Sequence, residues 1–307
     1  MSAAKTLDVV ALGEAMVEFN QGSGGLGWAA GFGGDTSNCV IAAARMGAAS
    51  GYLTQLGSDA FGDDLVELWR TEGVDTAGVR RVEGAETGLY FVRHGAQGHR
   101  FDYRRAGSAA SRMRPADLAP GLVERSRWLH VSGISQAISS SACDTVFEAV
   151  ARARAAGTRV SFDLNFRPAL WPAPRALATL RATLAQCDLF FPSVDEAQAL
   201  IGLDQPADIV AWAHDQGVAR VALKLGARGS LVSAGDGLVE VAPFPVTPLD
   251  ATGAGDCFAG AMLARLAAGD ELAAAARAAN IAAALSTQGY GAVAPLPRWS
   301  DVQPRLG

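Results

Sequence analysis

The segment Asp250–Asp256, with the sequence Asp-Ala-Thr-Gly-Ala-Gly-Asp, combines an anion-binding turn with a carboxylate. It lies between an extended stretch and a strongly helical one, so we expect a helix to begin within it. Gly253 and Gly255 let the backbone approach a ligand, and the helix start offers unpaired N–H groups and the positive end of its dipole to a phosphate. Asp256 would repel that phosphate, which makes sense if it accepts a proton from an attacking hydroxyl. The pattern alone leaves a second interpretation open, in which Asp256 only caps the helix.

A second loop-to-helix junction lies at residues 33–38, Gly-Gly-Asp-Thr-Ser-Asn. Gly33 and Gly34 permit a close approach of the backbone to a ligand, and the polar side chains from Asp35 to Asn38 can both cap a helix and bind hydroxyl groups. Taken alone, the junction has the composition of an ordinary helix cap.

One glycine-rich run matches a dinucleotide-binding pattern by letters only. Residues 22–27 read Gly-Ser-Gly-Gly-Leu-Gly, but they do not join a first strand to a helix, and no acidic residue lies near position 47. We therefore expect a flexible turn there and reject a dehydrogenase. The chain has no GxxxxGK[ST], HExxH or GxSxG motif, and its lysines are Lys5 and Lys224 alone.

Composition excludes several classes of function. The 307 residues are 50% hydrophobic, with 26 basic and 31 acidic side chains and a net charge of -5. A sizeable core is therefore expected, and a nucleic-acid surface is not, because such surfaces are usually basic. No apolar run approaches the ~18 residues of a membrane span, and no signal peptide is recognisable. The four cysteines lie far apart without CxxC pairs, so we expect free thiols and a cytoplasmic protein.

Apolar segments alternate with helical ones along most of the chain, which predicts an α/β fold with a mostly parallel sheet covered on both faces. We expect strands at 7–12, 51–56, 128–132, 159–164, 189–191 and 221–225, and helices at 36–46, 61–72, 139–156, 195–201, 207–216, 254–268 and 271–287. In such folds ligands bind at the carboxyl ends of the strands.

Two insertions interrupt this alternation and predict a small antiparallel sheet that acts as a lid. We assign 13–34 and 81–105 to the lid, with β-like segments at 87–92 and 100–105 and a turn at 94–98, and we assign 1–12, 35–80 and 106–307 to the core. Trp28, Phe32, Leu89 and Phe91 are available to line an apolar lid face. Pairing with a second copy would bury that face in a homodimer. The alternative is that the face packs on the chain's own core.

The two glycine-rich junctions together resemble the signatures of the ribokinase-like (pfkB) carbohydrate kinase family. Residues 33–38, followed by 56–62 (Leu-Gly-Ser-Asp-Ala-Phe-Gly), are similar to the N-terminal signature, and Asp250–Asp256 is similar to the highly specific C-terminal one. The resemblance runs nearly end to end. It implies a three-layer ribokinase-like core with a β lid that often forms a dimer contact, and the cofactors ATP and Mg²⁺. It also implies that Asp256 is the catalytic base and that Gly253, Ala254 and Gly255 form the anion hole.

Within this family the chain looks most like the 2-keto-3-deoxygluconate kinases. The similar segments are 87–90, 103–111, 163–168, 223–229 and 289–292. A carboxylate substrate suits a guanidinium fork. The resemblance implies that Tyr103 and Arg105 hold the sugar acid and that Arg167 adds a second positive contact. The full set of substrate-binding residues expected in this chain is Gly33, Gly34, Asn38, Tyr90, Tyr103, Arg105, Arg167 and Asp250.

The ATP side is also assigned by resemblance. The expected residues are Ser193, Glu196, Lys224, Gly226, Gly229 and Asn280, with adenine near Asn280 and the turn at 226–229. Many family members have asparagine where Ser193 stands, so this chain departs from the pattern there. Mg²⁺ is expected to bind through ATP and water, with Glu196 as the candidate carboxylate. Lys224 stands where other branches often have threonine, and its ammonium could neutralise phosphate charge.

The expected activity is ATP-dependent phosphorylation of 2-keto-3-deoxygluconate at its terminal hydroxyl. A fructokinase or another neutral-sugar kinase of the same family is the alternative. An alternative of another class is a catalytically silent, sugar-binding regulator on the kinase fold, which the intact Gly253–Asp256 segment disfavours. The expected partners are a small sugar acid and ATP, with no nucleic acid and no membrane, and the chain is expected to form a homodimer or a higher homo-oligomer.

Overall fold

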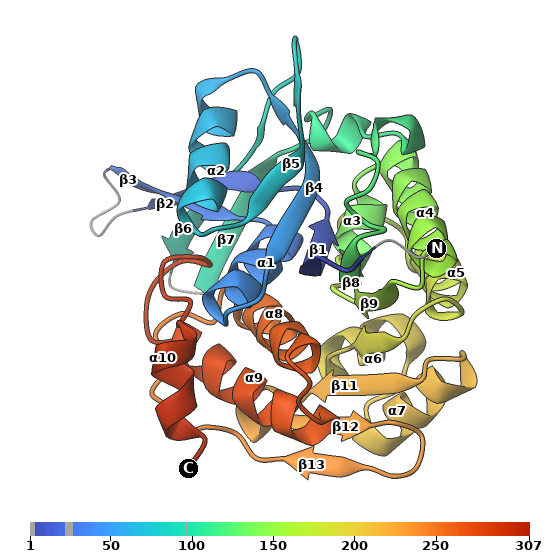
Figure 1. The fold of residues 1–307 in the computed structure, drawn as a ribbon. Coiled ribbons are helices and arrows are strands. Elements are labelled where there is room, and N and C mark those ends of the chain that lie inside the picture. The colour runs from blue at the N-terminus through green and yellow to red at the C-terminus, as the bar shows by residue number, and fades with distance from the viewer. Residues whose placement is uncertain (1–3, 22–26, 96–97) are drawn as a thin grey trace.

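The computed structural model describes residues 4–21, 27–95 and 98–307, and these residues form two β-sheets with helices packed around the larger one (Figure 1). The larger sheet has nine strands in the order β13-β12-β11-β10-β9-β8-β1-β4-β5. Its strands are β1 (Leu7–Leu12), β4 (Ser50–Gly57), β5 (Asp75–Val82), β8 (Ser126–Ser132), β9 (Arg159–Asp163), β10 (Leu189–Phe191), β11 (Arg220–Lys224), β12 (Ser230–Ser233) and β13 (Val239–Val241). The strands from β11 to β5 are parallel, whereas β12 and β13 pair antiparallel at one edge.

Helices cover both faces of this sheet. They are α1 (Asp35–Arg45), α2 (Ala60–Thr71), α3 (Gly133–Ala137), α4 (Ser140–Ala155), α5 (Ala173–Leu184), α6 (Val194–Ile201), α7 (Pro206–Asp215), α8 (Ala254–Ala267), α9 (Leu272–Ser286) and α10 (Trp299–Val302). One buried apolar cluster joins the sheet to α1, α2, α8 and α9, and a second joins its other face to α4, α5, α6 and α7. The three-layer α/β core expected from the sequence is confirmed.

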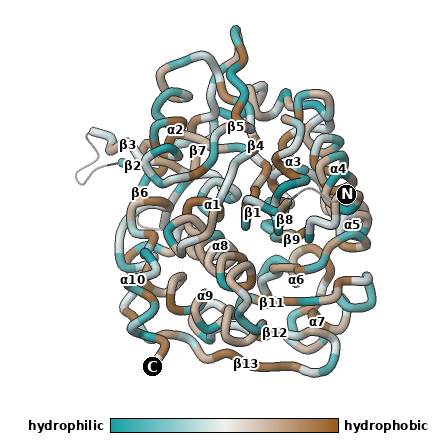
Figure 2. Tube along the Cα trace, in the orientation of Figure 1, coloured by the Kyte–Doolittle hydropathy of each residue, from teal (hydrophilic) through white to brown (hydrophobic). Residues whose placement is uncertain are grey.

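Strand β10 illustrates why the central strands read as continuous apolar runs. Phe191 points into the cluster with α8, whereas its neighbour Phe190 points into the cluster with α5 and α6. Alternate side chains of a strand face opposite sides, so a strand covered on both faces needs apolar residues throughout. Figure 2 shows the hydrophobic stretches along β11 and α8 that result.

The lid is a separate sheet of four strands in the order β3-β2-β6-β7 (Figure 1). Its strands are β2 (Met16–Gln21), β3 (Trp28–Gly33), β6 (Gly88–Gly95) and β7 (Gly98–Arg104). The expectation of a wholly antiparallel sheet was wrong, because β2 and β6 pair in parallel. They come from separate insertions, so no hairpin turn has to join them. The expected start at residue 81 is also early, since β5 continues in the main sheet to Val82.

Several elements were not expected from the sequence. Helix α5 has three alanines in its first half and follows Pro172. The proline suggested a loop at this point, although proline is well tolerated at a helix start. Strand β5 carries Arg80 and Arg81 at the edge of the sheet, where charged side chains reach water and obscure the apolar pattern. The expected glycine turn at 22–27 lies outside the described residues except for Gly27, as does part of the turn at 94–98.

The four cysteines are free and buried, as the sequence suggested. Within the described parts of the chain, no helix combines the length and the apolar character needed to cross a bilayer.

Candidate active site

A cavity of about 740 Å³ lies between the lid and the carboxyl ends of β1, β9, β10 and β11. Glu14 follows β1, Asn165 follows β9, Ser193 follows β10, and Lys224 ends β11, so the parallel sheet brings them to one edge. The starts of α1 and α8 face the same space. The sequence-predicted residues that line this cavity are Gly34, Asn38, Tyr90, Tyr103, Arg105, Arg167, Ser193, Glu196, Lys224, Gly226, Gly253, Gly255 and Asp256.

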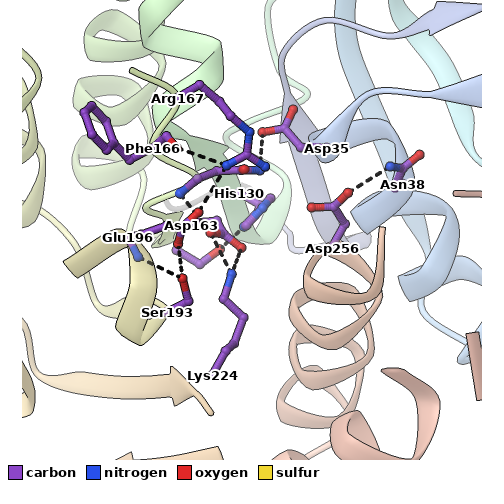
Figure 3. A network of polar contacts seen from close by, with 12 residues as sticks. Asp35, Asn38, His130, Asp163, Phe166, Arg167, Ser193, Glu196, Lys224 and Asp256 are labelled. Atoms are coloured by element: carbon purple, nitrogen blue, oxygen red, sulfur yellow. Dashed lines mark hydrogen bonds and ion pairs between the residues drawn. The ribbon is translucent and has the colours of Figure 1, made fainter. Parts of the chain in front are cut away.

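Asp256 lies in the first turn of α8 and points towards the start of α1 (Figure 3). Asn38 Nδ2 donates a hydrogen bond to Asp256 Oδ2 over 2.8 Å. Removal from bulk water and the neighbouring charge of Asp35 raise the pKa of Asp256 well above its usual range, and the Asn38 hydrogen bond opposes part of that shift. Asp256 is therefore a more basic carboxylate than an ordinary aspartate.

The start of α8 has the geometry of an anion-binding turn. Gly253 adopts a left-handed conformation (φ 75°), and no side chain caps the first turn. A Cβ at Gly253 would lie 3.1 Å from Ala292, so both the conformation and the packing require glycine. The Ala254 N–H already donates to Ala251 O over 3.2 Å. The N–H groups of Gly255 and Asp256 lie in the helix turn that has no intrahelical acceptors, and so they are the stronger anion donors.

Lys224 is held at this site by Asp163, the last residue of β9. Its Nζ donates to both carboxylate oxygens, over 2.9 and 2.8 Å (Figure 3). Burial alone would lower the pKa of Lys224, but Asp163 and Glu196 outweigh it and the net shift is upward. Burial raises the pKa of Asp163 to about 6 despite Lys224. A Cβ added at Gly255 would lie 3.4 Å from Lys224 Nζ, so a fixed cation stands beside the anion-binding turn.

Ser193 and Glu196 form a compact pair at the start of α6. Ser193 Oγ donates to Glu196 Oε2 over 2.8 Å and accepts from the Glu196 N–H. The other carboxylate oxygen, Oε1, lies 3.4 Å from Arg167 Nη1. Serine thus fills the position where a family asparagine was expected and still orients the glutamate.

On the lid side, Arg105 enters the cavity from the end of β7 and pairs with Glu14. Arg105 Nη2 lies 2.5 Å from Glu14 Oε2, and Ser108 Oγ donates to Glu14 Oε1 over 2.5 Å. The Arg105 side chain is 11% exposed and that of Glu14 is 0% exposed. No acceptor among the described residues forms a hydrogen bond with the buried Arg105 Nε. Arg105 Nη2 is in ion-pair contact with Glu14, but the pair lacks hydrogen-bond geometry. The guanidinium therefore keeps donor capacity for a ligand.

Tyr90 and Tyr103 lie side by side on the lid face that covers the cavity. Their rings stack with centroids 5.8 Å apart, and the Tyr103 ring lies 5.8 Å from the Arg105 guanidinium carbon. The Tyr90 hydroxyl donates to Glu18 Oε2. A Cβ at Gly33 would collide with that hydroxyl, so Gly33 makes room for Tyr90 and reaches the site only indirectly.

Some predicted residues are placed outside the cavity lining, namely Gly33, Ala254, Asp250, Gly229 and Asn280. Asp250 accepts from Thr252 and from the Gly291 N–H, so its carboxylate ties the motif to the loop near Gly291. Asn280 donates to the Val241 and Ala242 carbonyls and pins α9 to β13. The structure gives these two side chains contacts within the chain and brings neither into the cavity.

Sequence reasoning missed Glu14, Glu18, Asp163 and Asn165. Glu14, Asp163 and Asn165 were detectable, because each lies at the carboxyl end of a parallel strand. Asn165 adopts a left-handed conformation (φ 35°) and donates through Nδ2 to Asp35 Oδ2 over 3.0 Å. Glu18 carries no such signal, since only the pairing of β2 with β6 brings it to Tyr90.

The donor set fits a phosphate and its magnesium better than a metal held by protein alone. Among the described residues, no group of three or more His, Cys, Asp or Glu could hold a metal ion. Mg²⁺ commonly keeps waters and binds through one or two carboxylates together with substrate phosphates. Glu196 carries a carboxylate of this kind and lines the same cavity as Lys224 and the start of α8.

Comparisons with known proteins identify similar chains and similar folds. A model of the pfkB family of carbohydrate kinases matches residues 6–299. A 2-dehydro-3-deoxygluconokinase of Escherichia coli (strain K12) is 33% identical over 301 residues, which cover 94% of this chain and 97% of that protein. Fructokinase-1 of Zea mays is 33% identical over 319 residues, covering 98% of both. The crystal structure of a fructokinase from Xylella fastidiosa with bound ATP superimposes with a TM-score of 0.87 at 28% identity and covers 97% of both chains.

Proposed function

Because the chain belongs to the pfkB family of carbohydrate kinases, we propose that it transfers the γ-phosphoryl group of ATP to the terminal hydroxyl of 2-keto-3-deoxygluconate. This compound is the substrate named by 2-dehydro-3-deoxygluconokinase, the relative from Escherichia coli. The sugar acid would lie under the lid, and the phosphates of ATP would lie at the start of α8.

Asp256 is our candidate for the general base. A base must be close to the attacking hydroxyl and must have a proton affinity matched to its task. Two observations support Asp256 in this role: it faces the cavity beside the anion-binding turn, and its pKa is raised. Asn38 holds the carboxylate in one orientation. Asp256 would accept the hydroxyl proton as the sugar oxygen attacks the γ-phosphorus.

The start of α8 and Lys224 would stabilise the charge that develops on the transferred phosphoryl group. Such preorganised donors supply much of the catalysis in phosphoryl transfer. Asp163 keeps Lys224 charged and fixed, so the cation needs little rearrangement. Glu196 is our candidate for the magnesium water shell, and the ion would offset charge on the ATP phosphates.

Arg105 carries the choice of a sugar acid over a neutral sugar. A buried guanidinium that faces a cavity with a free donor is costly unless a ligand accepts from it. A substrate carboxylate is the acceptor best matched to it. Tyr103 beside Arg105, and Arg167 across the cavity, add a hydroxyl and a second positive charge.

A fructokinase is the second candidate, because fructokinase-1 of Zea mays and the 2-dehydro-3-deoxygluconokinase of Escherichia coli are both 33% identical to this chain. A screen of ADP release with 2-keto-3-deoxygluconate, 2-keto-3-deoxygalactonate and fructose separates the two. We expect the highest kcat/KM with 2-keto-3-deoxygluconate. A higher kcat/KM with fructose would overturn the sugar-acid assignment. If no sugar raises ADP release above the rate without sugar, the non-catalytic regulator would be favoured.

We also propose a cytoplasmic homodimer formed through the lid. ATP supply and four free thiols suit the cytoplasm. Trp28, Phe32, Leu89 and Phe91 share the lid face turned away from the cavity, and Trp28 is 40% exposed. The same face also touches its own core, since Phe19 packs edge-on against Phe61 of α2. A solution mass of one chain at micromolar concentration would refute the dimer and leave the kinase assignment intact.

A further inference from the structure

One row of residues crosses the lid sheet at its cavity face. Gly31 of β3, Glu18 of β2, Tyr90 of β6 and Tyr103 of β7 stand opposite one another in the strand pairing. Directly paired residues project to the same side of a sheet. Tyr90 and Tyr103 line the cavity. Glu18 is 3% exposed and is not among the described residues that line the cavity. Within this row, its link to the cavity is its hydrogen bond with Tyr90.

The hydrogen bonds to Glu18 determine whether the Tyr90 hydroxyl can donate to a ligand or only accept from it. The Tyr90 hydroxyl donates to Glu18 Oε2, and Asn20 Nδ2 donates to Glu18 Oε1 over 3.2 Å. Both oxygens accept, as a carboxylate does. Burial and the adjacent Glu18 charge raise the pKa of Tyr90 above its usual range, so the phenol keeps its single proton. That proton is committed to Glu18, and the phenolic oxygen can only accept on its cavity side.

We propose that Glu18 is a specificity-determining positioning residue that fixes Tyr90 as a hydrogen-bond acceptor for a sugar hydroxyl. The inference rests on the proposed function for the identity of the sugar. It adds to that function the orientation in which the substrate would bind. A sugar hydroxyl binds at Tyr90, and the substrate carboxylate, which can only accept, is directed away from Tyr90 towards the donors of Arg105.

The surroundings of Glu18 suit this role better than a role in stability. No ion pair to Glu18 is found in the part of the chain that the structure describes, so its buried carboxylate is compensated by hydrogen bonds. A buried carboxylate without a cation costs stability relative to an apolar residue. Small residues fit around it, because a Cβ at Gly31 would lie 3.5 Å and one at Gly291 3.6 Å from Glu18 Oε1. The surroundings of Glu18 thus accommodate its carboxylate, and the specific effect of that carboxylate is to orient the Tyr90 hydroxyl.

The test is a double-mutant cycle of Glu18→Gln and Tyr90→Phe in the full-length protein, with steady-state kcat and KM for the sugar and for ATP. Glu18→Gln changes the charge with little change in shape. We expect the KM for 2-keto-3-deoxygluconate to rise about 3- to 10-fold, the scale of one hydrogen bond, with the KM for ATP unchanged. Glu86→Gln, at an exposed glutamate just before β6, serves as the control and should change neither value.

In the Tyr90→Phe background Glu18 has no hydroxyl to orient, so Glu18→Gln should add less than 2-fold to the sugar KM. A further rise equal to that in the wild-type background would overturn the proposal. An equal rise in both KM values, or an unchanged sugar KM, would overturn it as well. Glu18→Met provides a second variant if Glu18→Gln is unstable, and the same coupling with Tyr90→Phe is expected.

Failure of the proposed function is distinguishable from failure of this inference. If the enzyme prefers fructose, the sugar-acid assignment fails, and the cycle is then read with fructose. Coupling between Glu18 and Tyr90 would then still support the acceptor role. If 2-keto-3-deoxygluconate is the better substrate and the two substitutions act independently, only the inference on Glu18 fails.

Discussion

The wall of the cavity at the start of α8 is made of backbone N–H groups and one fixed lysine, whereas the lid wall is made of side chains held by buried glutamates. At the first wall, Asp163 fixes Lys224 over the turn at Gly255. At the second, Glu14 fixes Arg105 and Glu18 fixes Tyr90. Under the proposed function, the first wall would bind a phosphate, which every kinase handles, and the second would bind the particular sugar.

The difference suggests a division of labour within one cavity. Substituting a side chain does not remove a backbone donor, so the wall at the start of α8 should tolerate most single changes. The exceptions are Gly253, whose conformation requires glycine, and the side chains of Asp163, Lys224 and Asp256. The lid wall depends on several side chains and on the register of four strands. Substitutions in the first wall should lower the rate with any sugar, and substitutions in the second should change which sugar is used.

The largest effect is expected from Asp256→Asn, which removes the proposed base while keeping the shape. Loss of a general base typically costs about 10²- to 10⁴-fold, so kcat should fall by that factor while ATP still binds. Stopped-flow or coupled ADP assays give kcat, and calorimetry gives the ATP affinity. A kcat near that of the wild type would overturn the assignment of Asp256 as the general base.

A smaller loss is expected from Lys224→Met, because it would remove the proposed charged contact to ATP phosphate. A hydrogen bond to a charged group is worth about 1.5–3 kcal/mol, so kcat/KM for ATP should fall about 10- to 100-fold. The variant also leaves Asp163 buried without its cation and should unfold at a lower temperature. The double variant Asp163→Asn/Lys224→Met should recover stability but not rate. Recovery of the rate would show that Lys224 has only a structural role.

Arg105→Ala should raise the KM for 2-keto-3-deoxygluconate about 10-fold or more and leave the KM for ATP nearly unchanged. The matched control is Arg104→Ala, because Arg104 is the adjacent residue of β7 and lies on the exposed surface. Equal changes in the two variants would argue against a specific carboxylate contact at Arg105.

The pH dependence provides the most subtle prediction. Asp256 must be ionised to accept a proton, and its pKa is raised, so kcat should fall with decreasing pH at values well above the ~3.9 of an ordinary aspartate. Asn38→Ala removes a hydrogen bond that favours the charged form, so this acid limb should move to still higher pH. A limb that moves downward in Asn38→Ala would contradict the assignment.

How much of the site can be read from the sequence depends on how local each part is. Asp256 and Gly253 are neighbours in one turn, so their type and spacing predict the anion site directly. Lys224 was assigned to phosphate from the charge of its ammonium at a position where other branches of the family often have threonine. Its partner Asp163 is 61 positions away and was not recognised. Glu18 meets Tyr90 only through the parallel pairing of strands from two insertions, which no local pattern encodes.

The fold shows the same dependence on locality. The strands buried on both faces, such as β1 and β10, were placed correctly from their apolar runs. The edge strand β5 and the Pro172-capped helix α5 were missed, because their patterns are weakened by solvent exposure or by residues that also favour loops. Asn280 was assigned to adenine by resemblance, yet its amide is bound to the backbone of β13 and of the residue that follows it.

The ratio of kcat/KM for 2-keto-3-deoxygluconate to that for fructose tests the division of labour most directly. It should be measured in the wild type, in Lys224→Met and in Arg105→Ala. The account predicts a ratio well above one in the wild type, the same ratio in Lys224→Met despite its lower rates, and a ratio about 10-fold lower in Arg105→Ala. A ratio that changes in Lys224→Met, or stays constant in Arg105→Ala, would contradict it.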